Sequence, residues 1–301
     1  MTGATSIVKA VIPVAGLGTR LLPATKAQPK EMLPVGRKPV VQYVVEELQS
    51  AGLSQILFVT GRKKTVIEDH FDTDPELVRI LSSGGGYAML EELAYTETET
   101  RFYYTRQSVP HGLADAVGHA EEFIDSDPFV VALGDSIIKD HNDSSFLKEL
   151  IETHLLHDAA CTIAVEEVSN EDVYRYGIIK PEAGADTSTS FVVADLVEKP
   201  RPEAAPSNLA IAARYVFNPV IFDAIRRTAP DRNGELQLTD SIHLLIQLGH
   251  KVRALRLRPD ERRYDIGNFE SYFKAFIDFS IADEKYGYLI RQYLKRKVRE
   301  F

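Results

Sequence analysis

Cysteine is almost absent from this sequence: among 301 residues only Cys161 occurs. A disulfide within the chain is therefore excluded, and no cluster of histidine and cysteine has the spacing of a zinc site. The chain also lacks any run of about 18 apolar residues, the length that a transmembrane helix needs. Its first residues lack the basic region and long apolar stretch of a secretory signal. These absences predict a soluble, cytoplasmic protein with no membrane partner.

An excess of positive charge is missing as well. The 35 lysines and arginines are outnumbered by 44 aspartates and glutamates, which gives a formal net charge of −9. A nucleic-acid-binding module is therefore disfavoured, and such a module would show salt-sensitive retention of DNA or RNA. Positive charge that serves a function must be local. This balance favours a small anionic ligand over nucleic acid.

Apolar and helix-like segments alternate along the chain. With 44% hydrophobic and 26% charged residues, the chain can bury the core of one large or two small domains. Six short runs have the composition of buried strands: residues 7–15, 55–61, 101–107, 129–135, 161–168 and 209–217. Segments with helical periodicity lie between them, at 38–52, 112–124 and 144–157. The alternation predicts an α/β fold with a mixed, mainly parallel sheet flanked by helices.

The first predicted strand leads into an unusual loop, residues 11–35, with the sequence VIPVAGLGTRLLPATKAQPKEMLPV. Gly16 and Gly18 allow the backbone to approach a ligand closely and to turn its N–H groups inward. Three prolines stiffen the chain around three cations, which are Arg20, Lys26 and Lys30. An arginine can bind two phosphate oxygens at once, and a lysine offers a point charge. In an open α/β sheet, such a loop predicts a polyphosphate site.

Two common phosphate motifs do not fit this loop. A dinucleotide-binding fold needs G-x-G-x-x-G at the start of a helix, but GLGTRL lacks the third glycine and prolines interrupt the residues after it. A P-loop needs G-x-x-x-x-G-K-[ST], and GRKKT at Gly61 lacks the upstream glycine. The sequence therefore supports neither a dehydrogenase nor a P-loop kinase.

The segment AGLGTRLLPATKAQPKEMLPVGRKPVVQYVVEEL closely resembles the N-terminal signature of bacterial UTP–glucose-1-phosphate uridylyltransferases. The resemblance continues in order through RQSVPHGLADA, VVALGD, YGII, LVEKP, GELQLTD and YDIGN. It implies a nucleotide-diphospho-sugar transferase fold that makes UDP-glucose and pyrophosphate from UTP and glucose 1-phosphate. It also implies a homodimer or homotetramer. The related thymidylyltransferases usually carry S-K-Q-L-L-P where this chain has PKEML, which favours uridine.

The resemblance assigns roles on the nucleotide side. Arg20 would bind the β- and γ-phosphates, and Lys30 would neutralise charge on the α-phosphoryl group, with Lys26 a weaker candidate. The nucleotide pocket would be formed by Ala15, Gly16, Leu17, Gly18, Gln107 and Gly112. The amide of Gln107 can present a donor and an acceptor to a pyrimidine edge. Gly112 would leave room for backbone contact.

The resemblance also assigns the sugar and metal sites. The sugar-phosphate residues would be Gly177, Glu198, Lys199 and Ala213. Lys199 suits the single phosphate, and Glu198 suits sugar hydroxyls. The cofactor would be Mg²⁺, which accepts one or two carboxylates plus phosphate oxygens, here from Asp135 and Asp265. From the residues alone, Asp135 could instead be a turn residue and Asp265 a helix cap.

Three departures from the family pattern leave the specificity open. The chain has GLADA where uridylyltransferases usually have G-L-G-H-A, Ala213 replaces a glycine, and Ser136 stands where the family has a second aspartate. The first two allow another nucleotide, such as dTTP, or another hexose 1-phosphate. The third allows a sugar-nucleotide-binding regulatory protein that has lost turnover.

The C-terminal segment has a different composition from the rest. From residue 268 onward the pattern is helical, first apolar and aromatic and then basic. The basic part is typical of a solvated helix end, where positive charge is favourable. We therefore predict a catalytic domain over residues 1–267. Residues 268–301 would form a helical extension that packs on the core or on a neighbouring subunit.

Overall fold

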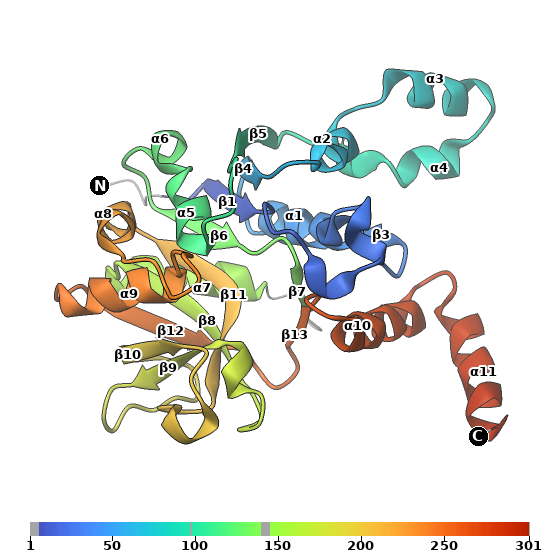
Figure 1. The fold of residues 1–301 in the computed structure, drawn as a ribbon. Helices are drawn as coiled ribbons and strands as arrows, with labels where there is room; N and C mark the ends of the chain where they lie inside the picture. Colours follow the sequence, from blue (N-terminus) through green and yellow to red (C-terminus); the bar gives the residue numbers. More distant parts are fainter. Residues whose placement is uncertain (1–5, 97, 140–144, 301) are drawn as a thin grey trace.

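A nine-stranded mixed sheet forms the centre of the molecule in the computed structural model (Figure 1). The structure describes residues 6–96, 98–139 and 145–300. The strands of this sheet are β1 (Lys9–Pro13), β4 (Gln55–Thr60), β5 (Arg101–Arg106), β6 (Phe129–Ala132), β8 (Cys161–Glu167), β9 (Gly177–Pro181), β10 (Ser190–Glu198), β11 (Leu209–Phe217) and β12 (Val252–Arg256). All six predicted strands are among them, and the predicted α/β class is confirmed.

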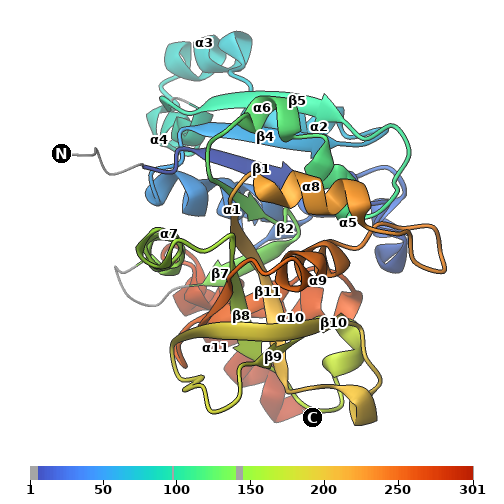
Figure 2. The same cartoon turned by 90° about the vertical axis from the view of Figure 1, so that its left-hand side faces the viewer.

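The strand order divides the sheet into two halves (Figure 2). It runs β5-β4-β1-β6-β11-β8-β12-β10-β9. Strands β5, β4, β1 and β6 pair in parallel, whereas the later neighbours are antiparallel apart from β8 with β12. The sheet is mixed as predicted, and its parallel pairing is concentrated in the half that carries the first loop.

Helices cover both faces of the sheet. They are α1 (Val40–Ser50), α2 (Thr65–Phe71), α3 (Pro75–Ser83), α4 (Tyr87–Glu91), α5 (Leu113–Gly118), α6 (Glu121–Ile124), α7 (Phe146–His157), α8 (Val220–Arg227), α9 (Leu238–Gln247), α10 (Phe269–Ala282) and α11 (Gly287–Lys297). One buried apolar cluster joins α5, α6, α8 and α9 to one face, and a second joins α1, α2 and α7 to the other. Along β1, Val11 belongs to the first cluster and Ala10 and Ile12 to the second, as the alternation of a strand requires.

The predicted helices are present, with changes at their ends. In α1 the four residues Val41, Val44, Val45 and Leu48 are at most 2% exposed, and Gly52 follows the helix with a φ of 91°. The helix predicted over 112–124 is interrupted between α5 and α6. In the described part of the chain, no helix combines the length and the apolar character needed to cross a membrane.

Two small two-stranded sheets lie beside the main sheet. One pairs β2 (Pro34–Val35) with β3 (Lys38–Pro39), and the other pairs β7 (Ser136–Lys139) with β13 (Arg262–Asp265). In the second sheet Asp265 lies opposite Ser136. This pairing brings the C-terminal part of the chain to the loop that follows β6.

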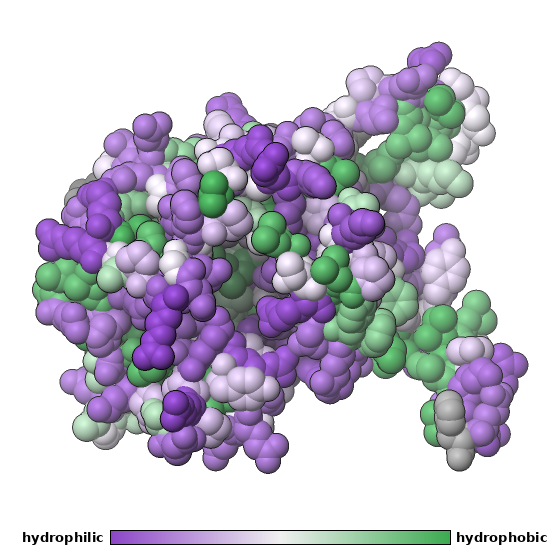
Figure 3. Space-filling model, in the orientation of Figure 1, coloured by the Kyte–Doolittle hydropathy of each residue, from purple (hydrophilic) through white to green (hydrophobic). Residues whose placement is uncertain are grey.

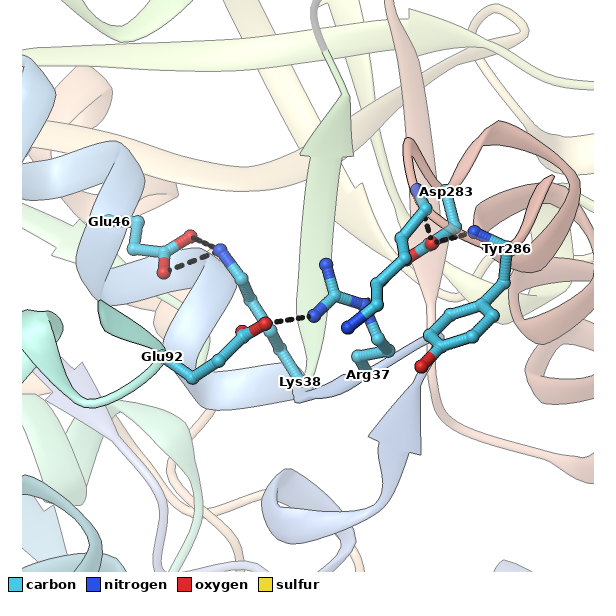
Figure 4. Close-up of polar contacts among 7 residues, drawn as sticks. Arg37, Lys38, Glu46, Glu92, Asp283 and Tyr286 are labelled. Atoms are coloured by element: carbon cyan, nitrogen blue, oxygen red, sulfur yellow. Dashed lines mark hydrogen bonds and ion pairs between the residues drawn. The ribbon is translucent and has the colours of Figure 1, made fainter. Parts of the chain in front are cut away.

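Two helical segments extend from the body on one side, α3 with α4 and α11 (Figure 1). Arg37, in the turn between β2 and β3, contacts the base of both (Figure 4). Its Nη1 donates to Oε1 of Glu92 at 2.6 Å, and its Nε donates to Oδ2 of Asp283 at 2.8 Å. The backbone N–H of Tyr286 donates to the other oxygen of Asp283 at 2.7 Å. One arginine thus connects both extensions to the body.

Candidate active site

Two hollows lie at the edge of the sheet where β1 and β6 end. The first has a volume of about 450 Å³ and is lined by the loop after β1 together with Gln107 and Gly112. The second has a volume of about 500 Å³ and is lined by residues of β9, β10 and β11. The residues that line both hollows are Arg20, Leu113, Leu133, Asp135 and Glu235. The hollows therefore meet at a charged junction.

The glycine loop wraps around the side chain of Lys30. A Cβ atom at Gly16 would lie 3.6 Å from Nζ of Lys30, and one at Gly18 would lie 3.4 Å from its Cβ. Gly18 has a φ of 66°, which glycine adopts without strain, and its carbonyl accepts from the hydroxyl of Thr25 at 2.7 Å. Ala15 and the exposed Leu17 complete this wall of the first hollow. The loop thus positions a lysine as well as its own N–H groups.

Lys30 forms an ion pair with Asp135, just beyond the end of β6. Burial by itself would lower the pKa of Lys30, but the carboxylates of Asp135 and Glu31 outweigh it and raise the pKa to about 12. Burial likewise acts to raise the pKa of Asp135, and Lys30 outweighs it, so that this pKa is lowered. Both groups are therefore charged at neutral pH.

A second buried ion pair lies behind the first. Glu31 is 1% exposed and accepts from Nζ of Lys64 at 2.6 Å, and Lys64 is 6% exposed. Lys64 belongs to GRKKT, the segment that fails as a P-loop. The pair ties the lysine-bearing loop to the segment after β4. The sequence offered no sign of this link, because the two partners are far apart in the chain and the PKEML signature, which contains Glu31, does not include Lys64.

Asp265 is the last residue of β13 and lies beside Asp135. The N–H of Ile266 donates to the carbonyl of Asp135 at 2.9 Å, which joins the two chain segments directly. Burial, followed by the negative charge of Asp135, raises the pKa of Asp265. The cap of α10 is Asn268, whose side chain accepts from the N–H of Ser271, so Asp265 is not the helix cap.

The donor set fits a hard cation that also binds phosphate. Among the described residues, no group of three or more His, Cys, Asp or Glu side chains gathers as a metal site. Asp135 and Asp265 lie near each other, since the charge of Asp135 contributes to the raised pKa of Asp265. One or two carboxylates are what Mg²⁺ takes from a protein when phosphate oxygens and water fill its other positions.

Arg20 and Lys26 differ in their placement. Arg20 is exposed and lines both hollows, and its guanidinium lies near Gly267, where an added Cβ would be 3.1 Å from Nη2. Lys26 is exposed and is not among the lining residues of either hollow. Of the three cations in the loop, Arg20 therefore lines the junction, Lys30 contacts it through Asp135, and Lys26 lies away from it.

Gln107 and Gly112 lie together at the wall of the first hollow. The Nε2 of Gln107 donates to Oδ2 of Asp115 at 2.6 Å and to the carbonyl of Gly112 at 3.2 Å. Gly112 has a φ of 103°, and a Cβ there would lie 2.4 Å from the carbonyl oxygen of Leu236. Position 112 therefore requires glycine, because the backbone of Leu236 occupies the space that a side chain would need.

The predicted sugar residues line the second hollow. The Oε2 of Glu198 accepts from the hydroxyl of Thr239 at 2.6 Å, and its Oε1 lies 3.0 Å from Nζ of Lys199. Gly177 lies opposite Glu198 in the sheet, and a Cβ there would come within 2.9 Å of the Thr239 hydroxyl. Lys199 is 56% exposed. Glycine at 177 thus leaves room for the carboxylate of Glu198.

Ala213 lies in an irregularity of β11, where its φ is 61°. This left-handed conformation is strained for alanine and free of strain for glycine, which explains the glycine of the family pattern. The next residue, Arg214, is fully buried and pairs with Glu47 at 2.6 Å. Its Nη2 also donates to the carbonyl of Ser136 at 2.9 Å, beside Asp135.

Several residues that line the second hollow were not predicted as site residues from the sequence. They are Arg175, Tyr176, Arg263, Glu235, Gln237 and Thr239. The guanidinium of Arg263 lies 4.4 Å from the ring centre of Tyr176, and its Nε donates to Glu166 at 2.6 Å. Glu235, Gln237 and Thr239 belong to GELQLTD, a motif of the family resemblance to which no role was assigned. That motif was the one sequence feature that could have identified these three residues.

Comparison with known proteins agrees with this geometry. The family model described as nucleotidyl transferase matches residues 9–280. A UTP–glucose-1-phosphate uridylyltransferase of Staphylococcus saprophyticus is 42% identical over 290 residues, covering 96% of this chain and 98% of the relative. One of Staphylococcus epidermidis is 39% identical with the same coverage.

Solved structures give the same result. A UTP-bound UGPase from Acinetobacter baumannii has a TM-score of 0.88 at 36% identity, covering 96% of this chain and 99% of that one. A UDP-glucose pyrophosphorylase complexed with UDP-glucose has a TM-score of 0.81 at 36% identity, with coverages of 91% and 98%. The resemblance to the uridylyltransferases is thereby confirmed, and the chain belongs to the nucleotidyl transferase family.

Proposed function

We propose that this protein transfers the uridylyl group of UTP to α-D-glucose 1-phosphate, giving UDP-glucose and pyrophosphate. The relatives named for this reaction are similar over nearly the whole chain, and the solved relatives hold UTP or UDP-glucose. The observation that carries the proposal is the junction of the two hollows at Arg20 and Asp135, with Lys30 paired to Asp135. Two anionic substrates can meet there.

The reaction is a direct displacement. A phosphate oxygen of glucose 1-phosphate forms a bond to the α-phosphorus of UTP, and the bond from that phosphorus to the bridging oxygen breaks as pyrophosphate leaves. Arg20 binds the β- and γ-phosphates and stabilises the leaving group. Lys30 neutralises charge on the α-phosphoryl group. Ala15, Gly16, Leu17 and Gly18 bound the nucleotide, while Gln107 and Gly112 face its base.

The second hollow takes the sugar phosphate. Lys199 binds its single phosphate, and Glu198 accepts hydrogen bonds from sugar hydroxyls. Gly177 and Ala213 line the same space.

Members of this family generally use a divalent metal. Here Asp135 and Asp265 would hold Mg²⁺, which supplies neutralisation of the phosphate charge when bound. Their separate origins at the ends of β6 and β13 mean that the fold must be formed before both carboxylates are available.

The same chemistry with another substrate is the second candidate. Ala213 puts a methyl group at the wall of the second hollow, in a conformation that suits glycine. A panel of pyrophosphate-release assays tests both, with UTP, dTTP, ATP, CTP and GTP each paired with glucose, galactose and N-acetylglucosamine 1-phosphates. We expect one dominant signal, from UTP with glucose 1-phosphate. A dominant signal from another pair would support the same reaction with different substrates. No pyrophosphate release from any pair, with nucleotide binding intact, would favour a regulatory protein.

We also propose that residues 1–267 form the catalytic domain, that residues 268–301 form the helical extension, and that the protein works in the cytoplasm.

We further propose that the protein assembles as a homodimer or homotetramer. Large apolar side chains are exposed on the extending helices: Leu77, Ile80, Tyr87, Met89, Tyr288, Leu289 and Tyr293. Figure 3 shows hydrophobic surface on both extensions. Exposed apolar surface of this kind is typical of a protein interface. Light scattering during size-exclusion chromatography measures the assembly, and a monomer would contradict it.

A further inference from the structure

Gln107 is held in one orientation by its surroundings. It follows β5, is 3% exposed, and its backbone N–H donates to the carbonyl of Thr60 at 2.9 Å. Its side-chain nitrogen donates to the carboxylate of Asp115 at 2.6 Å and to the carbonyl of Gly112 at 3.2 Å. The amide is therefore fixed at both its backbone and its side-chain nitrogen.

The chemistry of these partners decides which end of the amide faces the ligand. A side-chain amide carries two N–H donors on one atom and a carbonyl acceptor on the other. An ionised carboxylate and a backbone carbonyl only accept, so both donors of Gln107 are directed toward Asp115 and Gly112. Gln107 lines the first hollow, and Asp115 does not. The part of the amide left for a ligand is the carbonyl oxygen, Oε1.

We infer that Asp115 is a positioning residue that sets the base specificity of this enzyme by fixing Gln107 as an acceptor. The inference rests on the proposed placement of the base beside Gln107. Uracil carries an N–H donor at N3 and satisfies an acceptor there. Cytosine has an unprotonated N3, whose lone pair would face the lone pair of Oε1, and its amino donor lies at the neighbouring position, where uracil has O4. Thymine shares the N3–H of uracil, so this contact does not separate UTP from dTTP.

Asp115 is also one of the departures from the family pattern. It is the fourth residue of GLADA, where uridylyltransferases usually have histidine. An ionised carboxylate can only accept hydrogen bonds. An amide in the same place could donate to Gln107 and so allow the side-chain amide of Gln107 to rotate by half a turn. Besides Gln107, the carboxylate of Asp115 lies 3.7 Å from Nε2 of His119, one helical turn away. The wall of the hollow thus depends on a residue that does not touch the ligand.

The test is the Asp115→Asn variant, which keeps the shape and replaces the shorter of the two contacts that fix the Gln107 amide, so that only the carbonyl of Gly112 still requires a donor there. The readout is the inhibition constant of CTP against UTP divided by the KM for UTP, measured by pyrophosphate release with saturating glucose 1-phosphate. We expect this ratio to fall about tenfold, the worth of one hydrogen bond, with little change in kcat. Asp115→Ala, which leaves the amide without its carboxylate partner, should lower the ratio in the same direction.

Asp127→Asn is the matched control, because Asp127 is an exposed aspartate that pairs with Lys9 and lines neither hollow. It should leave the ratio unchanged. Gln107→Ala separates the base pocket from the role of Asp115. If Gln107→Ala leaves the KM for UTP unchanged, the proposed base pocket is wrong and the role of Asp115 falls with it. If Gln107→Ala raises that KM while both Asp115 variants keep the wild-type ratio, only the role of Asp115 is overturned.

Discussion

The two ends of the cleft are built in different ways. On the proposed nucleotide side two polar pairs are already formed: Lys30 pairs with Asp135, and Gln107 with Asp115. On the sugar side Lys199 is 56% exposed and pairs with its own neighbour in the chain, Glu198. A group held before the substrate arrives costs little to orient, whereas a largely exposed lysine loses more side-chain entropy on binding. Changes to Asp135 and Lys30 should therefore reduce turnover, and a change to Lys199 should weaken the binding of the sugar phosphate.

The largest effect is expected from Asp135→Asn. This change removes one of two carboxylates of the proposed metal site and the partner of Lys30, so kcat should fall by more than about 10³-fold and no longer respond to Mg²⁺. Pyrophosphate release across a magnesium titration measures both. Asp127→Asn, with the same change of charge outside the cleft, is the control. A magnesium response equal to that of the wild type would remove Asp135 from the metal site.

Lys30→Ala should come next, with a loss of about 10²-fold in kcat. In its proposed role the lysine acts on charge that develops during the reaction, so the KM for glucose 1-phosphate should change little. Lys26→Ala is a suitable control, because Lys26 belongs to the same loop and lines neither hollow. A large rise in the KM with unchanged kcat would mean that Lys30 merely binds substrate.

Lys199→Ala should show the opposite division. We expect the KM for glucose 1-phosphate to rise about tenfold, since one charge-assisted hydrogen bond is lost, while kcat stays near the wild-type value. Lys180→Ala removes an exposed lysine of β9 outside the second hollow and should have no effect. An unchanged KM in Lys199→Ala would place the sugar phosphate elsewhere.

Ala213→Gly should have the smallest effect, on stability. Alanine at a φ of 61° is strained, and glycine relieves that strain, so the free energy of unfolding should rise by about 1 kcal/mol. The adjacent change Ala212→Gly is the matched control and should destabilise, because Ala212 has no positive φ for glycine to relieve and its methyl group is buried in an apolar cluster. Urea unfolding measures both. Equal destabilisation by the two variants would show that Ala213 carries no strain.

The contrast between the two ends also separates what the sequence could predict from what it could not. Strands such as β1 and β6 are short apolar runs, and the loop after β1 holds its glycines and cations within one continuous stretch. Their placement follows from general rules for α/β sheets. Strand direction in the second half does not, because an apolar run pairs equally well in either direction. The strands β9, β10 and β12 were not among the six predicted strands.

Contacts between remote residues were the other limit. The partner of Lys30 is Asp135, which was assigned to metal from the resemblance and without any link to the lysine. Gln107 was expected to offer both a donor and an acceptor, but its donors are used by Asp115 and Gly112. Arg263 belongs to no recognised motif, although it lies buried in the wall of the second hollow. Such pairings depend on which segments the fold brings together.

Following the α-phosphorus itself would decide whether the uridylyl group is transferred. The protein is incubated with UTP labelled at the α-phosphate, glucose 1-phosphate and Mg²⁺, and the products are separated by chromatography. We predict that the label appears in UDP-glucose with one unlabelled pyrophosphate released for each molecule formed, and that Lys30→Ala slows both equally. UTP that binds but leaves its label in UTP, with every alternative sugar phosphate also inactive, would contradict the proposed transfer.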